Sequence, residues 1–255
     1  MMTNNKTPCR AGRYALLDEL RGLDLINMIA YHALWDLIFL FGVQADWYFE
    51  WQGRLWQFCI CSVFILLSGF CVPFGRHPFR RGWVVFGGGA LVTVVTLIFM
   101  PADRVVFGVL TFLGSAMLLT ALCRPLLEKI PAGWGLAASL VLFVVCYPIS
   151  SGYLGVGSWQ VVLPEALYAN YFTAYFGFMP WWFYSTDYFP LLPWLFLFWV
   201  GWFLHQVIGR KRMEPLRRSV CAPLGWLGRN SLVIYLLHQP LLYGVFLVIF
   251  SIGSH

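Results

Sequence analysis

Two histidines lie inside apolar stretches of the sequence, where an ionisable side chain is costly and is usually kept for a function. His32 lies in the first apolar stretch and His238 in the last, two residues before Pro240. Asp36 follows His32 by four residues, so both share one broad face of an α-helix. A carboxylate at that spacing would orient the imidazole and raise its basicity. The pattern therefore predicts a proton-transferring site in the middle of a membrane.

Each of these residues also has a purely structural interpretation. A histidine in a membrane helix can simply bond to a neighbouring helix, and this applies to His32 and to His238. Asp24, near the inner end of the first stretch, would equally form an ion pair with Arg21. For catalysis we take His32 as the first candidate, His238 as the second and Asp36 as the orienting carboxylate.

A further group of polar residues lies at the ends of the apolar stretches that are predicted to face the outer side of the membrane. Arg104 would pair with Asp36, Asp103 or Asp187, or it would bind an anionic or carbonyl group of a ligand. Tyr31 lies on the adjoining face of the first stretch. We therefore take Arg104, Asp187 and Tyr31 as candidate substrate-binding residues.

The elements that must position these side chains are membrane helices. Hydrophobic residues make up 60% of the 255 residues and charged residues 11%, against about 25% charged residues in a typical soluble domain. A span needs about 20 apolar residues, and seven stretches approach this length. They cover residues 23–41, 55–74, 83–100, 105–123, 134–147, 191–208 and 227–250. This predicts an all-α, polytopic transmembrane bundle that forms a single membrane domain over 1–255, and it excludes a water-soluble fold.

The basic residues predict how the chain crosses the membrane. The net charge is +6, and all but two of the 17 Lys and Arg residues fall in the N-terminal segment, in alternate connections between the apolar stretches, or, for Arg229, at the start of the last stretch. Only Arg54 and Arg104 lie on the other side. This bias indicates a cytoplasmic N-terminus, residues 1–22, and an odd number of spans, rather than a nucleic-acid partner. Asp24, His32 and Asp36 argue that the first stretch is a retained helix and not a cleaved signal peptide.

One long connection, residues 150–188, is rich in Tyr and Trp and would lie outside. Such sequence suits the membrane–water interface, and we expect an interfacial or re-entrant helix over 165–178. An eighth span at 163–180 is the alternative. The seven cysteines show no metal-ligand spacing, so we expect no metal site.

Five segments, taken together and in this order, resemble the heparan-alpha-glucosaminide N-acetyltransferase catalytic-domain family, in its bacterial branch. They read LDELRGLDLINMIAYHALWDL, FILLSG, RVVFGVL, SxDYFPLLPW and LGRNSLVIYLLHQPLL, and begin at Leu17, Phe64, Arg104, Ser185 and Leu227. The resemblance covers most of the chain. It implies a multi-pass protein of the bacterial cytoplasmic membrane that belongs to the transmembrane acyltransferases.

The resemblance also implies partners. Acetyl-CoA would be the acyl donor from the cytoplasm, and Arg21, Arg229 and Ser231 would bind it. A sugar-like acceptor, often an amino sugar, would lie on the far side, and a second copy of the chain is a candidate partner. Eukaryotic members carry their proposed catalytic histidine between the first two helices, but residues 42–56 here contain none. His32 stands where those members have asparagine, so that histidine has no counterpart here.

Two other functions fit the same residues. The midplane histidines would serve as a proton relay in a transporter of a small polar or anionic solute. A membrane scaffold without catalytic activity is the other function that fits these residues. Binding of CoA would favour the acyltransferase over both.

Overall fold

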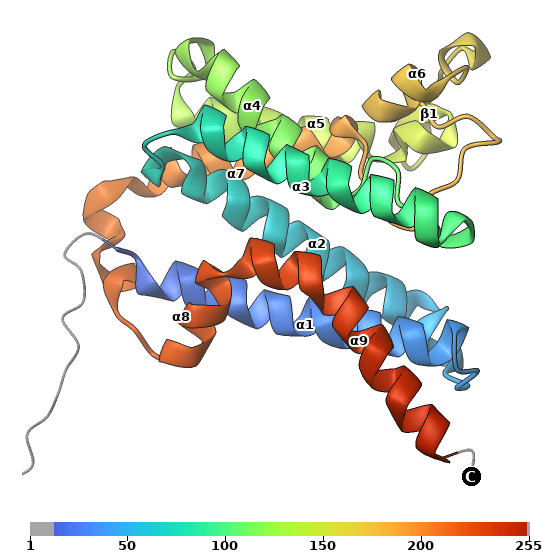
Figure 1. Ribbon diagram of the computed structural model, residues 1–255. Coiled ribbons are helices and arrows are strands. Elements are labelled where there is room, and N and C mark those ends of the chain that lie inside the picture. The colour runs from blue at the N-terminus through green and yellow to red at the C-terminus, as the bar shows by residue number, and fades with distance from the viewer. Residues whose placement is uncertain (1–12, 254–255) are drawn as a thin grey trace, which may run out of the picture. The chain divides into compact units, whose positions relative to one another are not determined.

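The computed structural model describes residues 13–253, so residues 1–12 of the predicted cytoplasmic N-terminus, with Lys6 and Arg10, and residues 254–255 lie outside the described part. The protein is predominantly helical, with one two-stranded sheet (Figure 1). Its helices are α1 (Ala15–Phe39), α2 (Trp51–Cys71), α3 (Pro78–Phe99), α4 (Val109–Leu127), α5 (Ala132–Cys146), α6 (Tyr171–Phe176), α7 (Leu191–Arg212), α8 (Ala222–Arg229) and α9 (Ser231–Gly253).

In the part of the chain that the structure describes, six helical segments are long and apolar enough to cross a bilayer. They are Trp51–Phe74, Pro78–Phe99, Val109–Leu127, Ala132–Ser151, Leu191–Gly209 and Ser231–Ser251. These confirm the predicted all-α, multi-pass fold. The first predicted span falls in α1, which is not among the six. Its polar residues, Asp24, His32 and Asp36 among them, lower its hydropathy, so a total of seven spans remains a prediction.

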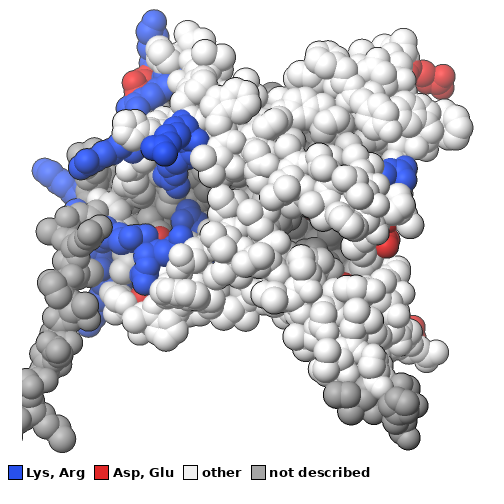
Figure 2. All heavy atoms as spheres, viewed as in Figure 1, with Lys and Arg blue, Asp and Glu red and all other residues white. Residues whose placement is uncertain are grey.

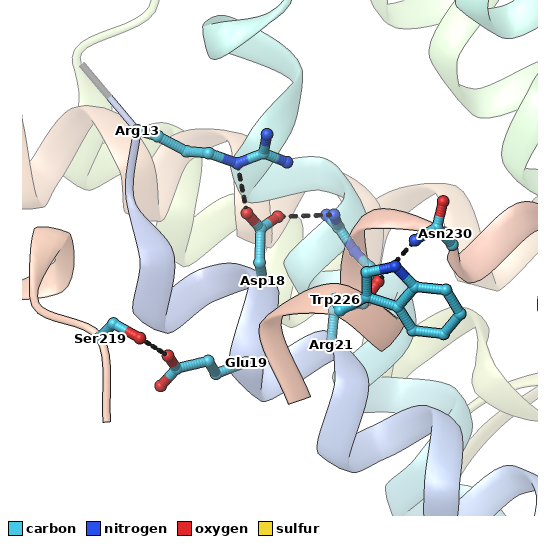
Figure 3. Close-up of polar contacts among 7 residues, drawn as sticks. All are labelled: Arg13, Asp18, Glu19, Arg21, Ser219, Trp226 and Asn230. Carbon is cyan, nitrogen blue, oxygen red and sulfur yellow. Dashed lines mark hydrogen bonds and ion pairs between the residues drawn. The ribbon is translucent and has the colours of Figure 1, made fainter. Parts of the chain in front are cut away.

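The last apolar stretch, predicted as one helix over 227–250, is two helices. α8 ends at Arg229 and α9 begins at Ser231, with Asn230 between them at φ −102° and ψ 16°. The Asn230 side-chain amide donates to the carbonyl oxygen of Trp226 at 2.9 Å (Figure 3). An asparagine that satisfies a terminal carbonyl in this way ends a helix.

The connection between α5 and α7 differs from the predicted helix over 165–178. It contains an antiparallel hairpin, β1 (Tyr153–Val156) and β2 (Trp159–Val162). Within residues 165–178, only the six-residue α6 and a short 3-10 turn, Glu165–Leu167, are helical. Gly177, at φ 120°, ends α6 in a conformation that favours glycine.

The chain divides into two compact units, residues 1–60 with 208–255 and residues 61–207. Unit 1 holds α1, the first half of α2, α8 and α9, and Figure 1 shows α1, α8 and α9 packed side by side. Its core contains Leu25, Met28 and Ile60. α8 packs closely on α1, because a Cβ added at Gly228 would lie 1.8 Å from the carbonyl oxygen of Asp18.

Unit 2 is also held together by small residues. A Cβ added at Gly89 of α3 would lie 2.4 Å from the amide nitrogen of Thr111 in α4. Gly87 has nothing within 4 Å. Of these two residues of the triplet 87–89, Gly89 therefore provides the helix contact expected of small residues in a span. A Cβ added at Gly69 of α2 would lie 2.0 Å from the carbonyl oxygen of Phe198 in α7.

Candidate functional site

The two histidines at the predicted depth come together in unit 1. His32 projects from α1 and His238 from α9, and the centroids of their rings are 4.9 Å apart at an interplanar angle of 62°. Two imidazolium cations so close would repel each other, so the pair holds one added proton more readily than two.

The hydrogen bonding of His238 fixes which of its nitrogens is basic. Nδ1 lies 2.6 Å from the backbone carbonyl oxygen of Tyr235. A carbonyl oxygen only accepts, so Nδ1 carries the proton of the neutral ring and donates it to this bond. Nε2 then holds the free lone pair, and it is buried with no hydrogen-bond partner among the described residues. His238 is 7% exposed. The ring therefore presents a base protected from water.

Asp36 makes a different contact from the one the sequence predicts. Its Oδ1 accepts a hydrogen bond of 2.6 Å from Nε2 of Gln239, whereas no hydrogen bond joins it to His32 in the described structure. Asp36 is fully buried, and its Oδ2 has no partner among the described residues. The sequence predicted no role for Gln239. The one sequence signal that pointed to it was its position next to His238.

Aromatic side chains lie beside His32. Tyr31 stacks on Tyr48 at 4.8 Å between ring centroids, and Trp56 meets Tyr31 edge-on at 5.4 Å. Burial, together with the neighbouring Tyr31 and Asp36, raises the pKa of the Tyr48 phenol well above its ordinary value. Tyr48 therefore stays neutral and can donate a hydrogen bond. Tyr31, a predicted substrate contact, thus lies in the same unit as both histidines.

The start of α1 forms an ionic cluster in the same unit (Figure 3). Asp18 accepts from Nε of Arg13 at 2.6 Å, and its other oxygen lies 3.9 Å from a guanidinium nitrogen of Arg21. The ion pair of Arg21 is therefore with Asp18, and the interpretation that pairs Arg21 with Asp24 is wrong. Asp24 is 7% exposed, and its Oδ2 has no partner among the described residues.

The other two predicted CoA-binding residues flank the break between α8 and α9. Arg229 is exposed at the end of α8, and Ser231 is half-buried as the first residue of α9. The first amides of α9 have no partner inside that helix, which favours a bound anion. In unit 1, Figure 2 shows Lys and Arg side chains gathered at the end where α1 begins. Positively charged side chains of this kind can form ion pairs with phosphate groups such as those of CoA.

A second carboxylate at this end was missed by the sequence analysis. Glu19 of α1 is 4% exposed and accepts hydrogen bonds from the Ser219 hydroxyl at 2.5 Å and the Val220 amide at 3.0 Å (Figure 3). Burial alone would raise the pKa of Glu19, but these bonds and one from the Cys221 amide lower it overall. Glu19 thereby fastens the segment that leads into α8 to α1.

The remaining predicted substrate residues, Arg104 and Asp187, belong to unit 2. Asp187 Oδ2 accepts from the amide nitrogen of Val109, the first residue of α4, at 3.0 Å. Arg104 donates to the carbonyl oxygen of Pro101 at 3.2 Å and lies over the Tyr184 ring at 5.4 Å. Asp187 therefore has a structural contact of its own, as the acceptor at the N-terminus of α4.

Comparison with known proteins adds to this geometry. No curated protein and no solved structure matches the chain significantly. The family described as "Heparan-alpha-glucosaminide N-acetyltransferase, catalytic" matches residues 13–240, which include α1, α8 and the first half of α9. The match thus covers His32, Asp36 and His238. The chain belongs to the heparan-alpha-glucosaminide N-acetyltransferase catalytic-domain family.

Proposed function

We propose that the protein is a membrane acetyltransferase that moves an acetyl group from cytoplasmic acetyl-CoA to an amine or hydroxyl of a sugar-like acceptor on the far side of the bacterial cytoplasmic membrane. The observation that carries this proposal is the imidazole pair of His32 and His238, with one buried, unpaired ring nitrogen. Family membership supplies the reaction class.

Nε2 of His238 is the proposed general base. It takes the proton from the attacking nitrogen or oxygen of the acceptor, and it returns that proton to the leaving sulfur. The bond from Nδ1 to Tyr235 holds the ring in the required tautomer throughout. His32 is in ring contact with His238 and packs beside this base. Our ranking of the two histidines is thus reversed, since no such tautomer lock is found for His32 among the described residues.

Acetyl-CoA, as co-substrate, supplies an acetyl thioester whose C–S bond breaks as the new C–N or C–O bond forms. Arg229 is the stronger candidate for holding its phosphates, because its guanidinium is exposed, whereas Arg21 is shared with Asp18. Ser231 and the first backbone amides of α9 would add uncharged donors.

Calorimetric titration of the purified full-length protein with acetyl-CoA tests the proposal. We expect saturable binding, weakened about tenfold or more in Arg229→Ala and less in Arg21→Ala, because a hydrogen bond to a charged group is worth about 1.5–3 kcal/mol. Arg124→Ala is the matched control, since Arg124 is an exposed arginine paired with Glu128 in unit 2.

Two results would count against this function. If folded wild-type protein did not bind acetyl-CoA, then acetyl-CoA would not be the acyl donor. Equal weakening by Arg229→Ala and Arg124→Ala would mean that only the general positive charge attracts CoA.

A further inference from the structure

The segment that joins α7 to α9 is fastened to the start of α1 in unit 1 (Figure 1). Near its beginning, Arg217 lies over the ring of Tyr14 at 4.8 Å from the centroid. Near its end, Gly228 of α8 approaches the carbonyl oxygen of Asp18, and Glu19 accepts the hydrogen bonds described above between these points. All of these contacts fall within about two turns of one helix. The segment therefore presents a defined outer surface.

The part of this surface formed by α8 is apolar. Gly225 and Gly228 are the buried residues of α8. Pro223 and Trp226 lie away from them by their spacing on the helix, and Trp226 is 56% exposed. Val220, just before α8, is 79% exposed. An exposed indole at this position suits the interface between lipid headgroups and acyl chains, where tryptophan is enriched in membrane proteins.

Cations without a counter-charge precede this apolar part. Lys211, Arg212 and Arg218 are exposed, and the ion pairs of the described residues include none of them. The apolar part of α7 that is long enough to cross a bilayer ends at Gly209. Lys211 and Arg212 therefore come directly after a membrane span, where lipid headgroups begin.

Charge and apolar exposure together indicate the kind of ligand. A soluble phosphate compound would pair with the cations and leave Trp226 and Val220 in water. An anionic phospholipid carries a phosphate and, directly beside it, acyl chains that would cover these two side chains. Segments that combine Lys and Arg with exposed tryptophan bind anionic membrane surfaces for this reason.

We propose that residues 211–226 form a docking surface for the headgroups of anionic phospholipids. Lys211, Arg212 and Arg218 pair with the lipid phosphates, and Trp226 enters the interface below them. This inference goes beyond the proposed acetyl transfer and does not depend on it, because Arg229, the residue proposed to bind acetyl-CoA, is not part of the surface.

Native mass spectrometry of the purified full-length protein in detergent tests the surface through the affinity of the first bound lipid. Wild type is expected to bind phosphatidylglycerol about tenfold tighter or more than phosphatidylcholine with the same acyl chains. Each contributing cation adds about fivefold. The triple variant Lys211→Gln, Arg212→Gln, Arg218→Gln is therefore expected to lose this preference.

A second triple variant is the matched control for lost charge. Arg76→Gln, Arg80→Gln, Arg81→Gln removes three exposed cations of unit 2 and is expected to keep the preference. Trp226→Ala is expected to weaken binding of phosphatidylglycerol severalfold, whereas Trp134→Ala, at an exposed tryptophan of α5, leaves it unchanged.

Three results would overturn the surface. The first is equal affinity of wild type for the two lipids, a comparison that needs no variant. The second is equal loss of preference in both triple variants, which would mean that net charge alone attracts the lipid. The third is displacement of the lipid by a tenfold excess of glycerophosphoglycerol, the headgroup without acyl chains, which would assign the cations to soluble phosphates. Acetyl-CoA binding is measured separately, so failure of the proposed function leaves this test intact.

Discussion

At the scale of single residues, the polar groups of unit 1 form two separate sets. His32, His238 and Asp36 lie beside Gln239, a residue whose role only the structure indicates. Glu19 instead accepts bonds from the segment before α8. The first set keeps buried atoms without hydrogen-bond partners among the described residues and is therefore the candidate for catalysis. The hydrogen bonds to Glu19 satisfy a buried charge and therefore stabilise the fold.

Glu19→Gln tests the stabilising role. A carboxyl whose pKa is lowered by folding stabilises the protein above its unfolded pKa, and this contribution is lost as pH falls through the lower, folded value. We expect the variant to melt at a lower temperature than wild type at pH 7, with the gap closing as the pH is taken below the ordinary carboxyl range. Glu128→Gln, in an exposed ion pair, is the control. A gap that stays constant with pH would contradict the ionised role of Glu19.

At the scale of elements, close helix contacts and one helix cap position the functional residues. α8 can lie against α1 because Gly22 and Gly228 have no Cβ where backbone carbonyls of the other helix approach. α4 begins at a glycine N-cap without a side chain of its own, so Asp187 supplies the acceptor from 78 residues away. Both devices depend on pairs of residues that are distant in sequence.

Gly228→Ala should disturb the contact of α8 with α1. The added Cβ would lie 1.8 Å from the Asp18 carbonyl oxygen, and overpacking of this kind costs about 1–3 kcal/mol. We expect a lower melting temperature and weaker acetyl-CoA binding, because Arg229 follows directly. Gly244→Ala in α9 is the control, since nothing lies within 4 Å of its Cβ position. Equal behaviour of the two variants would show that α8 does not approach α1 so closely.

Asp187→Ala and Asp187→Asn separate capping from substrate binding. Loss of a helix cap costs about 1 kcal/mol, which corresponds to a fall of about 2–4 °C in melting temperature for a chain of this size. Asn keeps an oxygen acceptor for the Val109 amide, so we expect it to melt near wild type and to retain acetyl transfer. Wild-type stability in both variants, with activity lost in both, would instead support the substrate-binding role predicted from the sequence.

The sequence was sufficient for the long helices and for the positions of His32 and His238 within two of them, since apolar length is a local signal. It did not predict the break at Asn230, where side-chain hydrogen bonding outweighs a continuous apolar run. It also missed the partners of Asp36 and Asp187. A carboxylate's partner depends on which helices pack together, and the spacing within one helix does not encode this.

At the scale of the whole molecule, the proposed reaction requires two accessible faces of one membrane. The charge distribution predicts that residues 1–22 and the connections after the second, fourth and sixth predicted spans lie in the cytoplasm. The proposed CoA-binding residue Arg229 is predicted to lie on that side. The hairpin and α6 are predicted to lie on the opposite side, where the acceptor is proposed to enter.

Introduced cysteines test this orientation. Ser158→Cys, exposed between β1 and β2, should react with a membrane-impermeant maleimide in intact cells, because the hairpin is predicted to lie outside. Lys129→Cys, exposed after α4, should react only after permeabilisation. Labelling above the wild-type background is the measurement. The reverse pattern would show that the chain has the opposite orientation in the membrane. Labelling of both cysteines in intact cells would contradict the single span predicted between residues 129 and 158.

Acetyl transfer by His238→Gln tests the central claim most directly. Purified wild type in liposomes, given acetyl-CoA and glucosamine, should release CoA thiol and form acetylated amine in equal amounts. Because a positioned general base contributes about 10²- to 10⁴-fold, His238→Gln should lose at least 100-fold in rate while its acetyl-CoA affinity stays unchanged. His77→Gln, at an exposed loop histidine, should match wild type. Full activity in His238→Gln would contradict the account, as would a wild-type protein that binds acetyl-CoA but transfers nothing.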